Sequence, residues 1–352
     1  MLIDVTASAR RLALVGLAKN TGKTQALAAL LRELERAGRR VGVTSVGRDG
    51  EEHDVIDFRI DKPRVNLPAH SLLATTDSLL SVSGVPFELL RDTGIRTPLG
   101  RVLITRLKGA GAVEVAGPSA AAQIREVSDA MLELGAEQVL IDGAIDRRAA
   151  SRPDVADALI ISTGAVLAPA IDDVVQITRR AVELVRLPTV ERSSPLGPWL
   201  DGRVAAGELG EGALLGEDLH PLVLPPRFAL SADGAAVREL LASMPSAPWL
   251  VIAGALPEAL LGHLAAACRP AHRSLQVIVT DPTRVFLHGR DLGWYAAQGV
   301  SITALTATPL LALTVNPLAP QSHTLDSREL RRLLGAEIPG VPIYDVLSPD
   351  YA

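Results

Sequence analysis

The stretch Gly16-Leu17-Ala18-Lys19-Asn20-Thr21-Gly22-Lys23-Thr24 is the strongest indication of the fold in this sequence. It follows an apolar segment, Arg11 to Val15, that predicts a short buried strand. It precedes a segment with apolar residues at helical spacing, namely Ala26, Leu27, Leu30, Leu31 and Leu34. A glycine-bounded loop between a strand and a helix is therefore expected near the start of the chain.

This loop resembles a P-loop. Phosphate oxygens need several donors in a small concavity, and backbone N–H groups at the N-terminus of a helix supply them. We expect Lys23 to reach the β- and γ-phosphates and Thr24 to place its hydroxyl on Mg²⁺. ATP is favoured over GTP, since the sequence has no Asn-Lys-x-Asp string of the kind that reads guanine. The other loop residues expected to contact the nucleotide are Gly16, Lys19, Asn20, Thr21 and Gly22.

Two further segments are candidates for the same site. Val139 to Asp142 is an apolar strand that ends in a carboxylate, so Asp142 is expected as a catalytic residue and second Mg²⁺ contact. Thr44 to Glu51 follows the second predicted strand, and there Asp49 is expected to orient the attacking water. The alternative interpretation of the second segment is a polar loop that turns at Asp-Gly. Asp146 either lies over the phosphates or belongs to a solvated charged turn.

The order of predicted elements indicates an α/β protein. A strand, a helix and a second strand at Arg40 to Val46 begin a parallel sheet with helices on both faces, the P-loop NTPase arrangement. We expect a nucleotide-binding domain over 1–186, a Pro- and Gly-rich linker over 187–227, and a smaller α/β domain over 228–352. Further strands are expected at Arg101 to Thr105, Gln138 to Ile141, Ala158 to Ser162, Trp249 to Ala253, Leu275 to Val279, Ser301 to Leu305, Leu311 to Val315 and Ile343 to Val346, and helices at Ala120 to Leu134, Ile171 to Val185, Ala235 to Ser243 and Pro257 to Cys268.

Composition limits the remaining function classes. The 352 residues carry 35 Lys and Arg against 40 Asp and Glu, a net charge of -5, which argues against nucleic-acid binding. The single cysteine, Cys268, permits no internal disulfide and is expected to pack inside a helix, while the histidines show no metal-binding spacing. The most apolar stretch, Ala158 to Ile171, is too short to span a bilayer. A cytoplasmic protein without a membrane partner is expected.

The loop is one residue longer than the common P-loop, with five residues between Gly16 and Gly22. In this it is similar to dethiobiotin synthetase and the cobyric acid synthase group of ATPases. Lys19 lies one residue away from the position of the extra lysine in dimer-forming relatives such as MinD. The second segment carries Ser45-Val46-Gly47 where the typical ligase has Lys-Pro.

Several strings together resemble the small P-loop subunit of the lysine 5,6-aminomutase reactivase. The resemblance implies a partner-stimulated ATPase that works with a larger MutS-like subunit to reactivate an adenosylcobalamin-dependent aminomutase, and the C-terminal domain would bind that partner. A dethiobiotin-synthetase-like ligase and a nucleotide-sensing binding module stay open as alternatives. Besides the loop, the strings are Val43 to Glu51, Ala116-Gly117-Pro118, Ile141 to Arg147, Ser162 to Ala165 and Val315-Asn316-Pro317, of which the last is turn-like in sequence.

Overall fold

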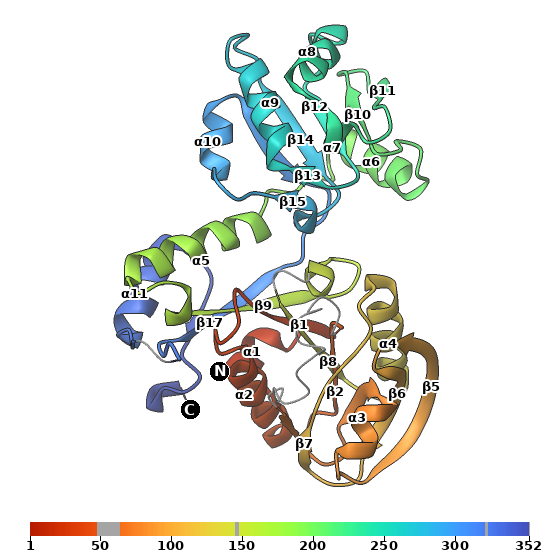
Figure 1. The fold of residues 1–352 in the computed structure, drawn as a ribbon, viewed down its shortest axis with the longest axis vertical. Coiled ribbons are helices and arrows are strands. Elements are labelled where there is room, and N and C mark those ends of the chain that lie inside the picture. Colours follow the sequence, from red (N-terminus) through yellow and green to blue (C-terminus); the bar gives the residue numbers. More distant parts are fainter. Residues whose placement is uncertain (48–63, 145–147, 321–322, 352) are drawn as a thin grey trace. The chain divides into compact units, whose positions relative to one another are not determined.

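The chain folds into two α/β units. The computed structural model describes residues 1–352 apart from 48–63, 145–147, 321–322 and 352. Unit 1 comprises Met1–Arg179 and Thr308–Ala352, and unit 2 comprises Arg180–Ala307. Each unit has its own sheet and its own covering helices (Figure 1). The α/β fold class predicted from the sequence is therefore confirmed.

A nine-stranded sheet forms the centre of unit 1, in the order β18-β17-β9-β1-β8-β2-β4-β6-β5. Neighbours from β18 to β4 run parallel, whereas β6 is antiparallel to β4 and to β5. The strands are β1 (Arg11–Gly16), β2 (Val41–Ser45), β4 (Leu72–Thr76), β5 (Phe87–Thr97), β6 (Gly100–Leu107), β8 (Gln138–Ala144), β9 (Ala158–Gly164), β17 (Leu310–Asn316) and β18 (Ile343–Tyr344).

Helices cover both faces of this sheet, as the side chains of β2 show. Val41 and Val43 belong to the apolar cluster that α1 (Leu2–Thr6) and α2 (Lys23–Arg36) share with β1. Gly42 points to the opposite face, where an added Cβ would lie 2.8 Å from the terminal methyl group of Met131. Met131 is on α4 (Ala121–Glu133). Strands covered in this way are mostly apolar on both faces, and the central strands of this sheet are apolar over most of their length, with polar residues such as Thr44, Ser45 and Ser162 toward their carboxyl ends.

The remaining elements of unit 1 lie at its margins. Among the described residues, no helix is both long enough and apolar enough to cross a membrane. The other helices are α3 (Asp77–Val82), α5 (Ile171–Val185), within which the unit boundary falls, and α11 (Ser327–Glu337). A two-stranded sheet pairs β3 (Val65–Leu67) with β7 (Gly111–Val113), and short 3₁₀ turns occupy Arg148–Ser151, Ala165–Leu167 and Pro349–Tyr351.

Unit 2 has a five-stranded sheet in the order β11-β10-β12-β14-β16. The last three of these strands are parallel, and β10 runs antiparallel to β11 and β12. Its strands are β10 (Gly212–Leu215), β11 (Pro221–Val223), β12 (Trp249–Ile252), β14 (Leu275–Val279) and β16 (Val300–Ala304), with a parallel pair β13 (Leu256–Pro257) and β15 (Val285–Phe286). Its helices are α6 (Leu196–Ala205), α7 (Phe228–Ser231), α8 (Gly234–Ser243), α9 (Glu258–Cys268) and α10 (Leu292–Ala297).

The division of the chain differs from the expected one in two respects. Residues 187–227, expected to be a linker, contain α6 and the strands β10 and β11, which are part of the unit 2 sheet. Residues 308–352, expected to belong to the smaller domain, return to unit 1, where β17 pairs with β9. Glycine and proline are as common at the ends of short helices and strands as they are in linkers. The apolar pattern of β17 does not indicate which sheet the strand will join.

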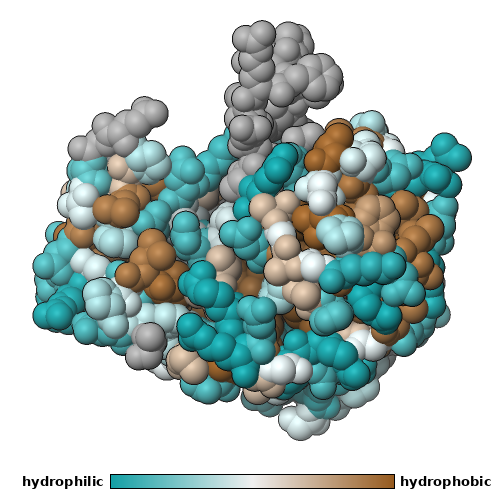
Figure 2. Space-filling model, turned by 90° about the horizontal axis from the view of Figure 1, so that it is seen from below, coloured by the Kyte–Doolittle hydropathy of each residue, from teal (hydrophilic) through white to brown (hydrophobic). Residues whose placement is uncertain are grey.

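Two of the exposed large apolar side chains of unit 1 lie on its edge strand β5. Figure 2 shows brown apolar residues on one face of the molecule, many of them gathered on the right of the view with teal hydrophilic residues among them. Val82 and Leu89 are 66% and 54% exposed, and Phe87 is 36% exposed. Leu89 and Phe87 lie on β5, an edge strand whose pairing with β6 is interrupted by irregularities in register. Such irregularities and charged neighbours are the usual protection of a sheet edge against further pairing.

Candidate functional site

The glycine-bounded loop lies at the carboxyl end of β1, in the middle of the large sheet. β1 pairs with β8 on one side and β9 on the other, and α2 begins at Lys23. Ligands of open α/β sheets bind at this edge. The fold therefore places the loop where its sequence requires it to be.

Internal contacts shape the first half of the loop. The Thr21 hydroxyl is buried and donates a hydrogen bond to the Ala18 carbonyl, at 3.0 Å. An added Cβ at Gly16 would lie 2.7 Å from the same hydroxyl oxygen. The N–H of Leu17 donates to the Ser162 carbonyl on β9, at 3.0 Å. Glycine is thus required at position 16 by the tight turn that Thr21 makes, while Ala18, Lys19 and Asn20 are exposed.

Gly22 caps the start of α2. Its φ of 85° lies in the left-handed region, which glycine adopts at little cost. The first N–H groups of the helix have no intrahelical partner, and with the helix dipole they make a site that favours anions. Lys23 and Thr24 are the first two residues of this 14-residue helix and are both partly exposed. The predicted phosphate-binding groups therefore share one helix N-terminus.

Lys23 and Asp142 form an ion pair. The Lys23 Nζ lies 2.7 Å from Asp142 Oδ1, and each side chain is 23% exposed. β8 is the direct neighbour of β1, with Asp142 opposite Leu14, so the carboxylate emerges beside the loop. The Oδ1 atom itself is buried, and Lys23 contacts it outside good hydrogen-bond geometry, so the attraction is mainly ionic. A cation and a carboxylate predicted separately from two motifs thus meet in the structure.

A third segment reaches this edge at the end of β2. The Ser45 hydroxyl donates to the Val115 carbonyl at 3.0 Å and accepts the N–H of Gly117 at 3.1 Å. The N–H of Gly47 donates to the Pro118 carbonyl at 3.0 Å. The string Ala116-Gly117-Pro118 therefore lies against the end of β2. Asp49, expected to orient the attacking water, and Asp146, a candidate for the loop over the phosphates, lie outside the described residues.

Asn316, which the sequence predicts to lie in a turn, contacts the glycine-bounded loop from the end of a strand. It ends β17, and its side-chain Nδ2 donates to the Asn20 carbonyl in the loop at 2.9 Å. An added Cβ at Gly22 would lie 2.9 Å from the Cβ of Asn316. No spacing rule relates residues 20 and 316, because their proximity depends on which strand pairs with β9. The only sequence signal was the string Val315-Asn316-Pro317 itself.

The residues at this edge fit a triphosphate with Mg²⁺. The loop offers N–H groups, a primary ammonium, the Thr24 hydroxyl and the Asp142 carboxylate, and the last two are oxygen ligands of the kind Mg²⁺ takes. Gly16 and Gly22 leave no room for a side chain because the Thr21 hydroxyl and the Asn316 side chain fill the space beside them, and this packing fixes the shape of the loop. Among the described residues, no cluster of three or more His, Cys, Asp or Glu side chains offers a metal site.

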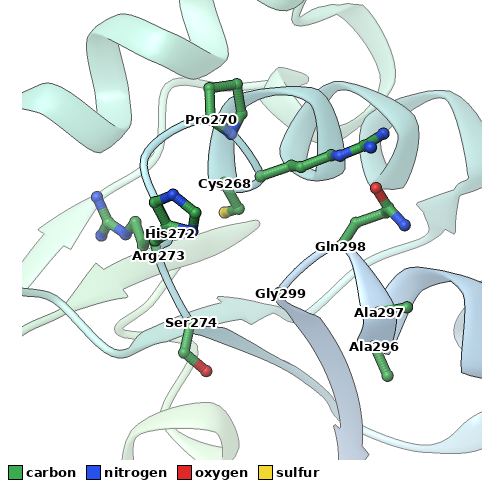
Figure 3. Close-up of a pocket in the computed structure, with 10 residues that line it drawn as sticks. Cys268, Pro270, His272, Arg273, Ser274, Ala296, Ala297, Gln298 and Gly299 are labelled. Carbon is green, nitrogen blue, oxygen red and sulfur yellow. The ribbon is translucent and has the colours of Figure 1, made fainter.

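Unit 2 contains a groove of about 780 Å³ at the amino-terminal end of its parallel strands β14 and β16. Figure 3 shows Cys268, Arg273 and Gln298 among the residues that line it. The guanidinium of Arg273 is committed to three carbonyl oxygens, those of Leu241, Met244 and Ala247. Burial raises the pKa of the Cys268 thiol, which makes it a poor nucleophile. The groove therefore contains an arginine whose guanidinium binds backbone carbonyl groups and a thiol that is a poor nucleophile.

The turn at Asp281 is also structural. The Asp281 carboxylate accepts hydrogen bonds from the N–H and hydroxyl of Thr283, and it lies 3.6 Å from the Arg284 guanidinium. The carboxylate is nearly buried and caps the short 3₁₀ turn that follows. Its groups are thus satisfied within the turn.

Comparisons with known proteins give little. No family model matches the chain, and no curated protein matches it. One solved structure is found, that of pNOB8 ParA bound to nonspecific DNA, with 13% identity over 57% of this chain and 77% of that chain, at a TM-score of 0.23.

The partners expected from the sequence need correction. The structure found is a complex of that protein with DNA, which conflicts with the expectation of no nucleic-acid partner, and this expectation, which rested on a net charge of -5, is withdrawn. Net charge describes the whole surface, whereas nucleic acid is bound by a local cluster of charges. The MutS-like subunit and the cobalamin-dependent aminomutase have no counterpart in the comparisons.

Proposed function

We propose that this chain binds and hydrolyses a nucleoside triphosphate, ATP, together with Mg²⁺, at the carboxyl edge of the unit 1 sheet. The observation that carries the proposal is the ion pair of Lys23 and Asp142, 2.7 Å apart, beside a helix N-terminus that begins at Gly22. An ordinary glycine turn has no need for a lysine and a carboxylate from a neighbouring strand at its rim. A triphosphate site needs both.

Each residue has a defined part in this proposal. The N–H groups at the start of α2 bind phosphate oxygens, and Lys23 leaves Asp142 to neutralise charge on the phosphates. Thr24 and Asp142 hold the Mg²⁺, which when bound neutralises the charge that develops on the transferred phosphoryl group. Because Lys23 and Asp142 are partners before binding, each needs another partner of opposite charge afterwards. Mg²⁺ and triphosphate supply these together.

The first test is Mg-ATP binding by the full chain, measured by titration calorimetry. Replacing Lys23 with Ala is expected to weaken binding by roughly 100-fold, because a charge-assisted contact to phosphate and the balance of the Asp142 charge are both lost. Lys108→Ala, at an exposed lysine, is the matched control and is expected to bind like the unaltered chain. No uptake of Mg-ATP or Mg-GTP by the folded chain would refute the proposal.

Three uses of the same site are distinguished by turnover. An ATPase of the reactivase type hydrolyses ATP without a small co-substrate. A ligase of the dethiobiotin synthetase type turns over ATP only with a diamine or dicarboxylate acceptor, and a nucleotide sensor binds without releasing phosphate. Phosphate release should therefore be measured with the chain alone and with these acceptors. We propose the first, since the Lys-Pro typical of the ligase is replaced by Ser45-Val46-Gly47, and Ser45 is committed to the backbone at Val115 and Gly117.

A further inference from the structure

The side chain of Asn316 is held in a fixed orientation. Its Oδ1 accepts the N–H of Leu318 at 3.2 Å, which leaves Nδ2 to donate to the Asn20 carbonyl at 2.9 Å. Swapping the two amide atoms would place a donor against the Leu318 N–H and an acceptor against the Asn20 oxygen. Both contacts would be lost, so the network selects one orientation.

The backbone of Asn316 is anchored as well. It lies opposite Gly164 in the pairing of β17 with β9, and an added Cβ at Gly164 would come within 2.1 Å of the Asn316 carbonyl oxygen. Next to it, the hydroxyls of Ser162 and Thr314 are hydrogen bonded across the two strands at 2.7 Å, in a buried position. The backbone of Asn316 is therefore held in place by the pairing of β17 with β9.

The residue that Asn316 contacts has an unusual conformation. Asn20 has a φ of 67°, in the left-handed region, which asparagine adopts more readily than most other residues with a side chain. All peptide bonds of the described chain are trans, so the N–H of Thr21 points away from the Asn20 carbonyl. Holding the Asn20 oxygen at Asn316 thus fixes the direction of the Thr21 N–H. It also fixes the turn that leads into Gly22.

We infer that Asn316 is a positioning residue for the phosphate-binding loop, which it holds in the shape that receives a triphosphate chain. The inference rests on the proposed function, because it assigns Asn316 a role at that same site. Without Asn316 the loop must order itself on binding, and that cost reduces affinity for anything that binds through its phosphates. The predicted defect is therefore independent of the nucleoside.

The test compares two ligands, Mg-ATP and Mg-tripolyphosphate, in titration calorimetry with the full chain. Asn316→Ala is expected to weaken binding of both by the same factor, about 3- to 10-fold, the range for loss of one neutral hydrogen bond. Asn66→Ala, at an exposed asparagine of unit 1, is the matched control and is expected to bind both ligands normally. Asn316→Ser replaces the alanine variant if that variant does not fold.

The outcomes distinguish a failure of the inference about Asn316 from a failure of the proposed function. If the unaltered chain binds neither ligand, the proposed function itself fails. If the unaltered chain binds but the Asn316 variants bind both ligands as well as it does, the positioning role is refuted. A loss confined to Mg-ATP would also refute it, because that result assigns Asn316 to the nucleoside rather than to the loop. An equal loss for both ligands supports it.

Discussion

At the scale of single residues, the proposed function requires the Asp142 carboxylate to exchange one charged partner for another. Asp142 is bound to Lys23 in the described structure, and in the proposed complex it serves Mg²⁺. The two roles make different demands on the carboxylate. A neutral side chain of the same shape can fill the space beside Lys23, but it is a weak ligand for a divalent cation.

Asp142→Asn should therefore separate binding from hydrolysis. We expect ATP hydrolysis to fall by about 10²- to 10³-fold, a size typical for the loss of one electrostatic contact to the transition state. ATP affinity should change much less, because Lys23 is released from its carboxylate and stays available for phosphate. Phosphate release and calorimetric affinity are the measurements, with the exposed Asp172→Asn as control. Unchanged hydrolysis would remove Asp142 from the site.

At the scale of elements, the start of α9 shows how unit 2 holds its helices together. The Glu258 carboxylate accepts the N–H groups of His288, Gly289 and Arg290, and the Tyr295 hydroxyl donates to it at 3.2 Å. Burial alone would raise the pKa of Glu258, but these backbone donors and Tyr295 lower it below its ordinary value. Burial, followed by the Glu258 charge, raises the pKa of Tyr295 to about 12. A single carboxylate thus joins α9 to α10.

This arrangement predicts a pH dependence of unfolding. The lowered pKa of Glu258 means that its stabilisation is complete above about pH 4.5 and is lost as the pH falls through the folded-state pKa. Glu258→Gln should reduce the free energy of unfolding of unit 2 at pH 7 by about 1–2 kcal/mol. The difference from the unaltered chain should shrink between pH 5 and pH 3. Urea unfolding across this range measures it, and a constant difference would contradict the assignment.

At the scale of the whole molecule, segments far apart in the sequence meet around the glycine-bounded loop and α2. β17, whose last residue contacts the loop, follows unit 2 in sequence and pairs with β9 inside the unit 1 sheet. The chain ends are also joined, since the Tyr351 hydroxyl accepts the N–H of Leu2 and donates to Glu33 on α2. Burial and the bond to Glu33 raise the pKa of Tyr351, which keeps this donor protonated at neutral pH.

A fragment of residues 1–186 should therefore fail as an independent domain, although the sequence predicts it to be one. Without β17 it exposes the edge of β9, whose residues are all buried in the full chain, and it loses the Tyr351 contact to Glu33. Exposed apolar strand edges lead to aggregation. We expect the fragment to be aggregated or partly unfolded and to lack Mg-ATP binding, as measured by sedimentation, circular dichroism and calorimetry. A monomeric fragment with normal affinity would contradict this.

Prediction from sequence succeeded where the pattern was local and apolar. The strands at Arg11, Gln138 and Ala158 and the helix after Gly22 lie where periodicity placed them. β4 and β5 were not predicted: β4 is a short run, Leu72–Thr76, and β5, Phe87–Thr97, is a polar edge strand. β5 is exposed along nearly its whole length and has register irregularities, so it shows neither a continuous apolar run nor strict alternation.

The sequence by itself determined the glycine-bounded loop, the lysine and hydroxyl that follow it, and a strand that carries Asp142 near its carboxyl end, although β8 continues to Ala144. These depend on neighbours in the chain, and strand ends of a parallel sheet meet at one edge whatever their order. Only the tertiary structure decided that Lys23 pairs with Asp142, that Asn316 reaches Asn20, and that residues 308–352 complete unit 1. The physical reason is that strand order is set by the packing of the whole apolar core, and the local pattern of a buried parallel strand is compatible with any interior place in a sheet.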